Sequence, residues 1–469
     1  MALKLFNTLT RSVQEFTPPP AGARTIGLYC CGPTVHDFAH IGNWRMFVFA
    51  DLLRRTLEYY GGEVRHVMNI TDVEDKIIKR VQEQNVTLRE FTGKFEAAFF
   101  EDLKALNCLP PHLTPRATEH MPEIIALIEK LVARGLAYRA ADGSVYFSIE
   151  KYRGGGALYG QLQKLNLDEL RTGQRVAADE YDKEAVADFA LWKARVPTDG
   201  EVFWPSPWGE GRPGWHIECS AMSLKALGTN FDFHLGGEDL KFPHHEDEIA
   251  QSEGATGQPF VKHWLHGAHL MVEGRKMSKS LGNFFTLRDL LAKGFTGREV
   301  RFLLLRVHYR ETFNFTIEGL HGAKAALARI DECVGKLREL GAGTAPAAGS
   351  AARLPEAFSA ALADDLNISA AWAAVFDWVS ETNKRLAENA CGAAEAAAAL
   401  AAWEKVDAVL GVGVKSEATI PAAIQALLEA RQSARQTKDF KRSDAIRDEL
   451  KASGWVIEDT PKGPKLKKC

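Results

Sequence analysis

Cysteine is scarce in this sequence, and long apolar runs are absent. The chain has 7 cysteines in 469 residues, an odd number at scattered spacings, which argues against a disulfide framework and for a reducing compartment. No stretch reaches the roughly 20 apolar residues that a membrane-spanning helix needs. The first residues, MALKLFNTLTRSVQEF, lack the basic start and apolar run of a secretory signal. We therefore expect a cytoplasmic protein with no membrane partner.

A large excess of charge of either sign is also missing. The chain carries 58 Lys and Arg against 61 Asp and Glu, a net charge of −3, so its total charge does not indicate a nucleic-acid partner. The basic residues are concentrated at the end, where residues 421–469 contain 11 Lys and Arg against 7 Asp and Glu. This basic module favours a polyanionic partner, although a solvated helix with a frayed tail explains the charge equally well.

The N-terminal part has the pattern of a parallel α/β sheet. RTIGLYCCG (residues 24–32) is a short apolar strand, and WRMFVFADLLRRTLEYYGG (residues 44–62) has helical periodicity and stops at a glycine pair. EVRHVMNITD (residues 63–72) is a second strand, followed by a charged helix from about Val73. Strand, helix and strand of these lengths predict a βαβ unit.

The rest of the chain divides into further domains, and its length predicts three or four in all. Residues 118–199 indicate an insertion with a helix, a hairpin and a Gly-rich loop, after which NFDFHLGG and FVKHWLHGAHLMV restore parallel-strand character. Beyond residue 284 the pattern is helical, with breaks at GAGTAPAAGSAARLP and GVGVKSEATIP. The Ala-rich AENACGAAEAAAALAAW (residues 387–403) is expected to be helix.

Two short motifs suggest phosphate chemistry. HIGN, from His40 to Asn43, lies between a strand and a helix, where a helix N-terminus binds anions and Gly42 leaves room for a flat ring. GRKMSKSLGN (residues 274–283) places two lysines in a loop with glycine on both sides, and such a loop could close on a leaving pyrophosphate. Each motif has a plain alternative, an ordinary helix start and a polar surface loop.

A third constellation has the composition of a metal site. GWHIECSAM supplies Cys219, and FPHHEDEIAQ supplies two histidines and Glu248. His244 and Glu248 are four residues apart and share one face of a helix, which Pro243 would open. With a cysteine from YCCG, the donors are two sulfurs, one nitrogen and one oxygen, the kinds that zinc prefers. Spacing alone leaves His245 as an alternative to His244, and does not choose between the two adjacent cysteines.

The order of these motifs resembles a known family. HIGN and KMSKS resemble the two signatures of class I aminoacyl-tRNA synthetases. CCGPTVHDFAHIGN, NITDVEDKI, WPSPWGEGRPGWHIECSAM and HLGGEDLKFPHHEDEIAQS closely resemble the cysteinyl-tRNA synthetases. The resemblance extends from LFNTLTR to KDFKRSDAIRDELKASGWVIEDTPKG.

This resemblance implies an α/β fold. A Rossmann-type parallel-sheet catalytic domain (1–117 and 200–290) would contain an inserted subdomain (118–199), and its second half would carry the zinc site and the KMSKS loop. A stem-contact region (291–320), a helical bundle (321–415) and a small C-terminal anticodon-binding domain (416–469) would follow.

The resemblance also implies an activity, the ATP-dependent attachment of L-cysteine to tRNA(Cys) through a cysteinyl-adenylate. The implied partners are tRNA(Cys), ATP and L-cysteine, the implied cofactors are one Zn²⁺ per chain and Mg²⁺ with ATP, and a monomer is expected. Zinc would distinguish cysteine from serine because a thiolate is a soft ligand and a hydroxyl is not. A pocket that read only the size difference would gain about 1–3 kcal/mol.

The family's functional residues map onto this sequence by position. Those of the metal site are Cys31, Cys219, His244 and Glu248, because the family has its ligand directly before the glycine and uses the first histidine. Those near the amino acid are Gly32, Thr71 and Trp215. Those of the ATP site are His40, Gly42, Asn43, Gly236, Asp239, Lys276, Ser278 and Lys279, of which His40, Asn43, Lys276 and Lys279 are the expected catalytic residues. Those for tRNA are Arg435, Phe440, Asp444 and Asp459.

One residue departs from the family pattern, and three other functions compete. The first signature usually ends in His, whereas Asn43 cannot become cationic; we expect activity to survive. A related ligase family that joins cysteine to an amino-sugar shares the catalytic core but lacks the module at residues 421–469. A non-catalytic zinc and nucleic-acid binding protein, or a metallohydrolase using HHEDE, would also fit single motifs.

Strand alternation predicts that Cys30 faces away from Cys31 and serves in packing.

Overall fold

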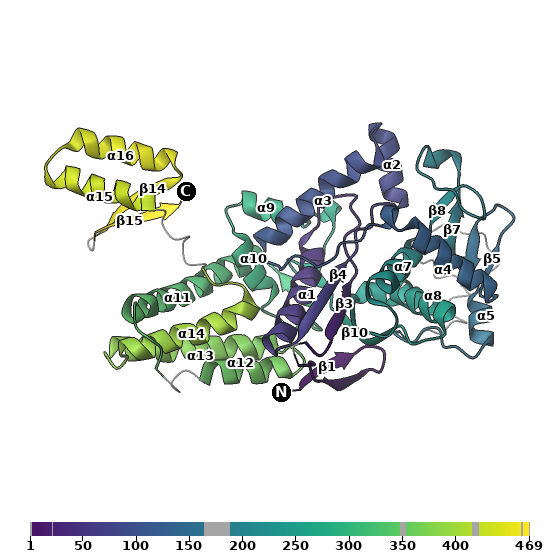
Figure 1. Ribbon diagram of the computed structural model, residues 1–469, viewed down its shortest axis with the longest axis horizontal. Coiled ribbons are helices and arrows are strands. Elements are labelled where there is room, and N and C mark those ends of the chain that lie inside the picture. Colours follow the sequence, from purple (N-terminus) through teal and green to yellow (C-terminus); the bar gives the residue numbers. More distant parts are fainter. Residues whose placement is uncertain are drawn as a thin grey trace. The chain divides into compact units, whose positions relative to one another are not determined.

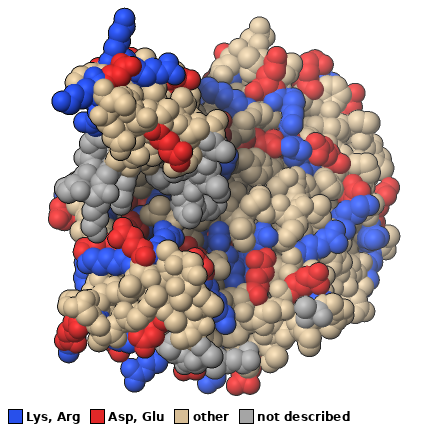
Figure 2. Space-filling model, turned by 60° about the vertical axis from the view of Figure 1, so that its left-hand side comes forward, with Lys and Arg blue, Asp and Glu red and all other residues tan. Residues whose placement is uncertain are grey.

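The computed structural model describes residues 2–20, 22–163, 188–347, 353–414, 422–460 and 463–468. They belong to two compact units, Met1–Val412 and Gly413–Cys469. None of the described helices is long and apolar enough to cross a membrane. On the face in Figure 2, acidic and basic side chains are interspersed, as the small net charge of −3 leads one to expect.

A parallel sheet forms the centre of the first unit (Figure 1). Its strands, in spatial order, are β10 (Val261–Gly267), β9 (Phe231–Gly237), β3 (Thr25–Cys30) and β4 (Glu63–Met68). All three pairings are parallel. Residues 26–30 of β3 and all of β9 are buried, because helices and loops cover both faces of the sheet. The α/β fold and the positions of these strands confirm the sequence-based prediction.

Helix α1 (Ile41–Tyr59) begins at the HIGN motif, three residues before the predicted start. His40 is its N-cap: the His40 Nδ1 atom accepts from the Asn43 backbone N–H (3.2 Å), and Asn43 Oδ1 accepts from the His40 N–H (3.1 Å). This is a capping box in which His and Asn take the usual places of Ser and Glu. Gly61, with φ of +85°, ends the helix as predicted.

The insertion folds as a small antiparallel sheet. Its strands are β5 (Ala137–Arg139), β6 (Val145–Phe147), β7 (Phe189–Ala194) and β8 (Gly211–Pro213), with helices α4 (Met121–Ala133) and α5 (Ile149–Gly154) alongside. The predicted helix and hairpin are α4, β5 and β6, whereas β7 and β8 were not predicted. Strand β8 lies beyond the expected boundary at residue 199 and pairs with β7 through Trp192 and Pro213.

Further elements surround the central sheet. They are the hairpin β1 (Leu3–Asn7) and β2 (Ser12–Phe16), helices α2 (Asp75–Gln84), α3 (Leu88–Ala105), α7 (Trp215–Leu227) and α8 (Glu246–Thr256), and the strands β11 (Leu270–Val272), β12 (Arg275–Lys276) and β13 (Phe313–Phe315). Strand β13 corrects the prediction that the chain is helical beyond residue 284. Phe313 and Phe315 are buried on either side of exposed Asn314 and pair in parallel with β11.

The C-terminal part of the first unit is helical. Its helices are α9 (Leu287–Ala292), α10 (Gly297–Leu304), α11 (Ile317–Gly341), α12 (Arg353–Ala363), α13 (Ile368–Ala387) and α14 (Ala393–Leu410). The Ala-rich segment 387–403 is helical as expected over residues 393–403, but it is interrupted, because α13 ends at Ala387 and α14 begins at Ala393. Asn389 adopts the left-handed conformation (φ +54°), which terminates a helix regardless of the alanines that follow.

A buried ionic group attaches α14 to α1. Asp51 Oδ2 accepts from Arg301 Nη2 (2.6 Å) and from Arg55 Nε (2.7 Å), and all three residues are largely buried. The same arginines donate to the last carbonyls of α14, Arg301 to Leu410 O (2.6 Å) and Arg55 to Ala408 O (2.8 Å). Charged donors at these carbonyls also favour the negative end of the helix dipole.

The second unit contains helices α15 (Ala422–Gln436) and α16 (Phe440–Ala452) and a hairpin of β14 (Trp455–Thr460) and β15 (Gly463–Lys468). Its own small core includes Ile446, Leu450 and Trp455. The hairpin was not predicted. Most of the second predicted break, residues 415–421, lies outside the described residues.

Candidate functional site

A cleft of about 860 Å³ opens where β3, β4, β9 and β10 end and α1 begins. The carboxyl edge of a parallel sheet is the usual place for a ligand site, because strand ends and helix N-termini meet there. The lining includes twelve of the predicted residues: Cys31, Gly32, His40, Gly42, Asn43, Thr71, Trp215, Cys219, Gly236, Asp239, His244 and Lys276. Residues more than 200 positions apart in the sequence therefore meet in one cavity.

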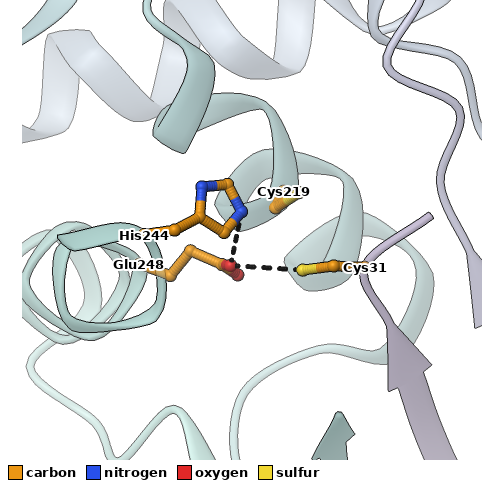
Figure 3. Close-up of side chains that lie close together, drawn as sticks. All are labelled: Cys31, Cys219, His244 and Glu248. Atoms are coloured by element: carbon orange, nitrogen blue, oxygen red, sulfur yellow. Dashed lines mark hydrogen bonds and ion pairs between the residues drawn. The ribbon is translucent and has the colours of Figure 1, made fainter. Parts of the chain in front are cut away.

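The predicted metal-binding residues come together at one end of this cleft (Figure 3). Single donor atoms of Cys31, Cys219, His244 and Glu248 all lie within 4.8 Å of one another. Glu248 Oε1 is 3.1 Å from His244 Nε2 and 3.6 Å from Cys31 Sγ. Two sulfurs, one nitrogen and one oxygen at this spacing fit the donor set that zinc prefers.

Each donor comes from a different local structure. Cys31 follows β3 directly, Cys219 lies in the second turn of α7, and Glu248 lies in the first turn of α8. Helix α8 begins at Glu246, three residues after the predicted start at Pro243, and Phe242 before the proline is extended (φ −142°, ψ 134°). His244 reaches Glu248 from the segment that precedes α8, with its Nε2 3.1 Å from Glu248 Oε1.

The charges of this cluster suit a cation. The Cys31 thiol lowers the pKa of Cys219, against the effect of burial. Burial raises the pKa of Glu248, but His234 and His244 overcome this and lower it to about 2. Burial lowers the pKa of His244, but Cys219 and Glu248 outweigh it and raise the value to about 10. The anionic forms of Cys219 and Glu248 are thus favoured, whereas burial and Cys219 raise the pKa of Cys31. Metal binding requires deprotonated ligands, so Cys31 and His244 would each release a proton to the solvent when a cation binds.

The second histidine of the pair also lies close by. Donor atoms of Cys31, His234, His245 and Glu248 form another group within 4.8 Å. His245 Nε2 is 3.4 Å from Cys31 Sγ, and its Nδ1 is 2.8 Å from His266 Nε2. The two groups differ in access: Cys31, Cys219 and His244 line the cleft, whereas of the second group only Cys31 does. A metal that contacts a ligand in the cleft fits the first group better.

Cys30 differs from its neighbour in surroundings. Its side chain is 1% exposed and belongs to the main apolar core, with Leu28 and Leu235. Burial raises the pKa of the Cys30 thiol to about 12, so that it stays protonated at neutral pH. Cys31 belongs with the metal cluster instead. Cys30 also borders the cleft, but its place in the core agrees with the predicted packing role.

The chain just after the KMSKS motif (residues 276–280) is hydrogen-bonded to the start of α1. Ile41 N–H donates to Phe285 O (3.0 Å), and Met277 lines the cleft beside Gly42. Asn283 Oδ1 accepts from Ser278 N–H (2.9 Å), and its Nδ2 donates to the carbonyls of Val272 and Lys276 at 3.2 Å each. Lys276 is exposed in β12, and the side chain of Lys279 lies outside the described parts of the structure.

Close packing fixes the part of the cleft around Gly32. A Cβ on Gly32 would lie 1.6 Å from Asn69 O, so no larger residue fits there. Asn69 Oδ1 accepts from Gly32 N–H (2.8 Å), and Asn69 Nδ2 donates to Thr71 Oγ1 (3.2 Å). The ring centroid of Trp215 is 4.3 Å from that of His244. Thr71 is thus connected through Asn69 to Gly32, the residue after Cys31, and Trp215 packs against His244.

Sequence reasoning missed several residues around the cluster. Asn69 and Asn283 hold the two ends of the cleft. Three buried histidines, His216, His234 and His266, contact the predicted ligands or the alternative ligand His245. Only His216 could have been found from the sequence, because it precedes Cys219 by three residues, about one helical turn. His234 and His266 carry no such local signal, because they lie on separate strands.

The four residues predicted for tRNA lie in the second unit. Arg435 is exposed on α15, Phe440 and Asp444 are exposed on α16, and Asp459 belongs to β14. Phe440 is 63% exposed, unusual for so large an apolar side chain, and offers a ring face on which a base could stack.

Comparison with known proteins gives a consistent result along the whole chain. Residues 18–325 match the tRNA synthetases class I (C) catalytic domain, residues 357–415 a DALR domain, and residues 417–464 the cysteinyl-tRNA ligase anticodon binding domain. The Cysteine--tRNA ligase of Chlamydia pneumoniae is 47% identical over 471 residues, which cover 99% of this chain and 98% of that protein. That of Protochlamydia amoebophila is 46% identical, with the same two coverages, 99% and 98%.

Solved structures show the same fold at low identity. A Mycobacterium tuberculosis methionyl-tRNA synthetase in complex with methionyl-adenylate aligns with a TM-score of 0.58 and 14% identity, over 82% of this chain and 90% of that chain. The LeuRS in a ternary complex from Agrobacterium radiobacter K84 aligns with a TM-score of 0.60 and 12% identity, over 85% of each chain.

These matches decide between the competing functions. The anticodon binding domain at residues 417–464 is the module that the amino-sugar ligases lack. A catalytic domain over residues 18–325 leaves no reason to invoke a non-catalytic zinc protein or a metallohydrolase. The chain belongs to the cysteinyl-tRNA synthetases, the class I aminoacyl-tRNA synthetases that attach cysteine to tRNA.

Proposed function

We propose that the cleft converts L-cysteine and ATP to cysteinyl-adenylate, and that a zinc ion held by Cys31, Cys219, His244 and Glu248 recognises the substrate thiol. The observation that carries this proposal is the position of the four-donor cluster: it lies in the same cleft as the N-terminus of α1. A single bound amino acid can then contact the metal with its side chain and ATP with its carboxylate.

The physical need for a metal comes from the likeness of cysteine and serine. The two amino acids differ by one atom, and a pocket that distinguishes ligands only by size gains about 1–3 kcal/mol from a difference of that kind. When bound, zinc supplies a soft Lewis acid that binds a thiolate far better than a hydroxyl. The chain's own part is to hold the four donors in a buried position beside Thr71 and Trp215, which would contact the backbone of the amino acid with Gly32.

Adenylate formation needs no protein nucleophile, because the carboxylate of cysteine attacks the α-phosphorus of ATP. The residues therefore act by positioning and by stabilising charge. His40, Asn43 and the free N–H groups of α1 would contact the phosphates, while Gly42, Gly236 and Asp239 would bound the nucleotide. Lys276, Ser278 and Lys279 would approach the pyrophosphate, and Mg²⁺ would accompany ATP.

The remaining domains would serve tRNA(Cys). Residues 291–320 would contact its stem, and residues 416–469 would read its anticodon with Arg435, Phe440, Asp444 and Asp459. The helical bundle of 321–415 would join the two, with residues 118–199 as the insertion in a catalytic domain of 1–117 and 200–290. We expect a cytoplasmic monomer.

The test is cysteine-dependent exchange of pyrophosphate into ATP, with the zinc content measured on the same protein. We expect one zinc per chain, loss of exchange after removal of zinc by a chelator, and recovery when zinc is returned. Serine should support far less exchange than cysteine. Full exchange and undiminished preference for cysteine in protein free of zinc would refute the role of the metal.

A further inference from the structure

A chain of buried polar contacts joins the Gly-rich loop of the insertion to the metal cluster. Tyr159 Oη donates to Asp247 Oδ1 (2.5 Å), and Asp247 Oδ2 lies 3.4 Å from His216 Nε2. His216 Nδ1 is 2.8 Å from His244 Nδ1, whose other nitrogen, Nε2, is 3.1 Å from Glu248 Oε1. Tyr159 is thus three contacts away from a donor of the metal cluster, although it belongs to the inserted segment.

The protons of this chain follow from one condition, that His244 offers Nε2 to a metal. A neutral His244 that offers Nε2 to a metal carries its proton on Nδ1 and donates it to His216 Nδ1. The proton of His216 is then on Nε2, which faces Asp247 Oδ2. Asp247 Oδ2 is buried and forms no hydrogen bond among the described residues, and His216 Nε2, at 3.4 Å, is the group that faces it. Because a buried acceptor needs a donor, a proton on His216 Nε2 would satisfy this oxygen, while Tyr159 donates to Oδ1.

The position of Tyr159 is itself fixed on the helix that carries Glu248. Glu246 accepts three backbone N–H groups of the loop, from Gly160 (2.6 Å), Gln161 (2.9 Å) and Leu162 (3.0 Å). Gly160 has φ of +93°, which directs these groups to one carboxylate. Glu246 and Asp247 are adjacent in the first turn of α8, so the loop and its tyrosine are held at two neighbouring points.

We infer that Tyr159 is a positioning residue for the metal centre. Its hydroxyl orients the Asp247 carboxylate, which holds His216 in the tautomer that fixes the ring of His244. This inference rests on the proposed function, since it requires that His244 binds zinc. Partners of this kind, one step behind a metal ligand, set the orientation and basicity of the ligand, and their loss costs about 10–100-fold in metal affinity. Because Tyr159 is three contacts from the ligand His244, we expect its loss to weaken metal binding by the lower end of this range, about tenfold.

The test compares Tyr159→Phe with Tyr138→Phe in the full-length chain. Both changes remove a hydroxyl that donates to an aspartate in the same subdomain, since Tyr138 Oη donates to Asp188 Oδ2 (3.0 Å). Zinc affinity is measured by competition with a chelator, and the Co²⁺-substituted proteins are compared by their absorption spectra. The Michaelis constants for cysteine and ATP are measured by pyrophosphate exchange. Melting of the zinc-depleted proteins reports on stability alone.

We expect about tenfold weaker zinc binding, an altered cobalt spectrum and a raised KM for cysteine in Tyr159→Phe. The KM for ATP should be unchanged, and Tyr138→Phe should match the original chain throughout. Unchanged zinc affinity and spectrum in Tyr159→Phe would overturn the inference, and so would a lowered melting temperature without a change in zinc binding. If the original chain itself binds no zinc, the proposed function fails first, which is a separate result.

Discussion

The buried ion pair between Asp51 and Arg301 allows a quantitative prediction for Asp51→Asn. Arg301 is fully buried, and Asp51 is its only carboxylate partner within 4 Å among the described residues. Removal of one partner of such a pair costs about 3–5 kcal/mol, because the remaining charge is left uncompensated. Arg301 keeps its bonds to the carbonyls of Leu410 and Leu106 (2.6 and 3.2 Å). We therefore expect about 3 kcal/mol, the lower end of the range.

Asp331→Asn is a matched control, because its partner Arg298 lies on the same helix as Arg301, α10. Asp331 accepts two bonds from Arg298, at 2.7 and 2.6 Å, but this pair is partly exposed. Exposed pairs contribute about 0–1 kcal/mol. The free energy of unfolding is measured for both variants by urea denaturation followed through tryptophan fluorescence. Equal losses in the two variants would refute the claim that burial, and not the number of bonds, sets the cost.

The same pair predicts a dependence on pH. Burial raises the pKa of Asp51, but Arg301 and Arg55 outweigh it and lower the value below the ordinary one. A lowered pKa in the folded protein stabilises it above the unfolded value of about 3.9, and this contribution is lost as the pH falls through the folded pKa. The difference between the original chain and Asp51→Asn should therefore be largest near pH 7 and shrink below about pH 4. A difference that stays constant down to pH 3 would contradict the assignment.

Three further predictions concern the site and the domains. Cys31→Ser should lose zinc and cysteine-dependent pyrophosphate exchange, whereas Cys30→Ser should retain both; equal damage would mean that the ligand is assigned wrongly. Because removal of zinc should abolish exchange, its effect on selectivity is measured by binding: the ratio of the Kd values for serine and cysteine should fall to about 10–200-fold or less, the range of a pocket that reads size, and an unchanged ratio would exclude the metal from recognition. Truncation before Ile420 should leave exchange largely intact and impair charging of tRNA(Cys); normal charging by the shortened chain would disprove the anticodon assignment.

The fold could be predicted where the signal is local. The strand before Cys31, the periodicity of α1 and the glycines that end it all lie within one stretch of sequence, and each led to the observed element. Strand β13 could not be found in this way. Phe313 to Phe315 is too short to read as a strand, and it becomes one only because Leu270 and Val272, more than 40 residues earlier, pair with it. Strand β8 depends in the same way on β7.

The residues of the site, too, could be predicted only where the signal is local. The residue types of a zinc centre were visible in the sequence, but spacing left His244 and His245 equivalent, and the choice between them came from resemblance. The structure brings both histidines close to Cys31, and they differ in which one lines the cleft. That difference depends on the packing of α7 against α8 and the sheet, which no local pattern encodes. His234 and His266 were missed for the same reason, since their partners are distant in sequence.

The capping box at His40 and Asn43 has a consequence for how far the first signature can vary. The backbone N–H of His40 needs an acceptor from the side chain three residues on, and the Asn43 amide oxygen supplies it. An imidazole nitrogen can accept in the same way, so asparagine and histidine are interchangeable for starting this helix even though only one of them can be charged. Part of the pattern known as a catalytic signature therefore records a folding requirement. Substitutions at its last position should be tolerated according to their ability to cap a helix, as well as by their contact with phosphate.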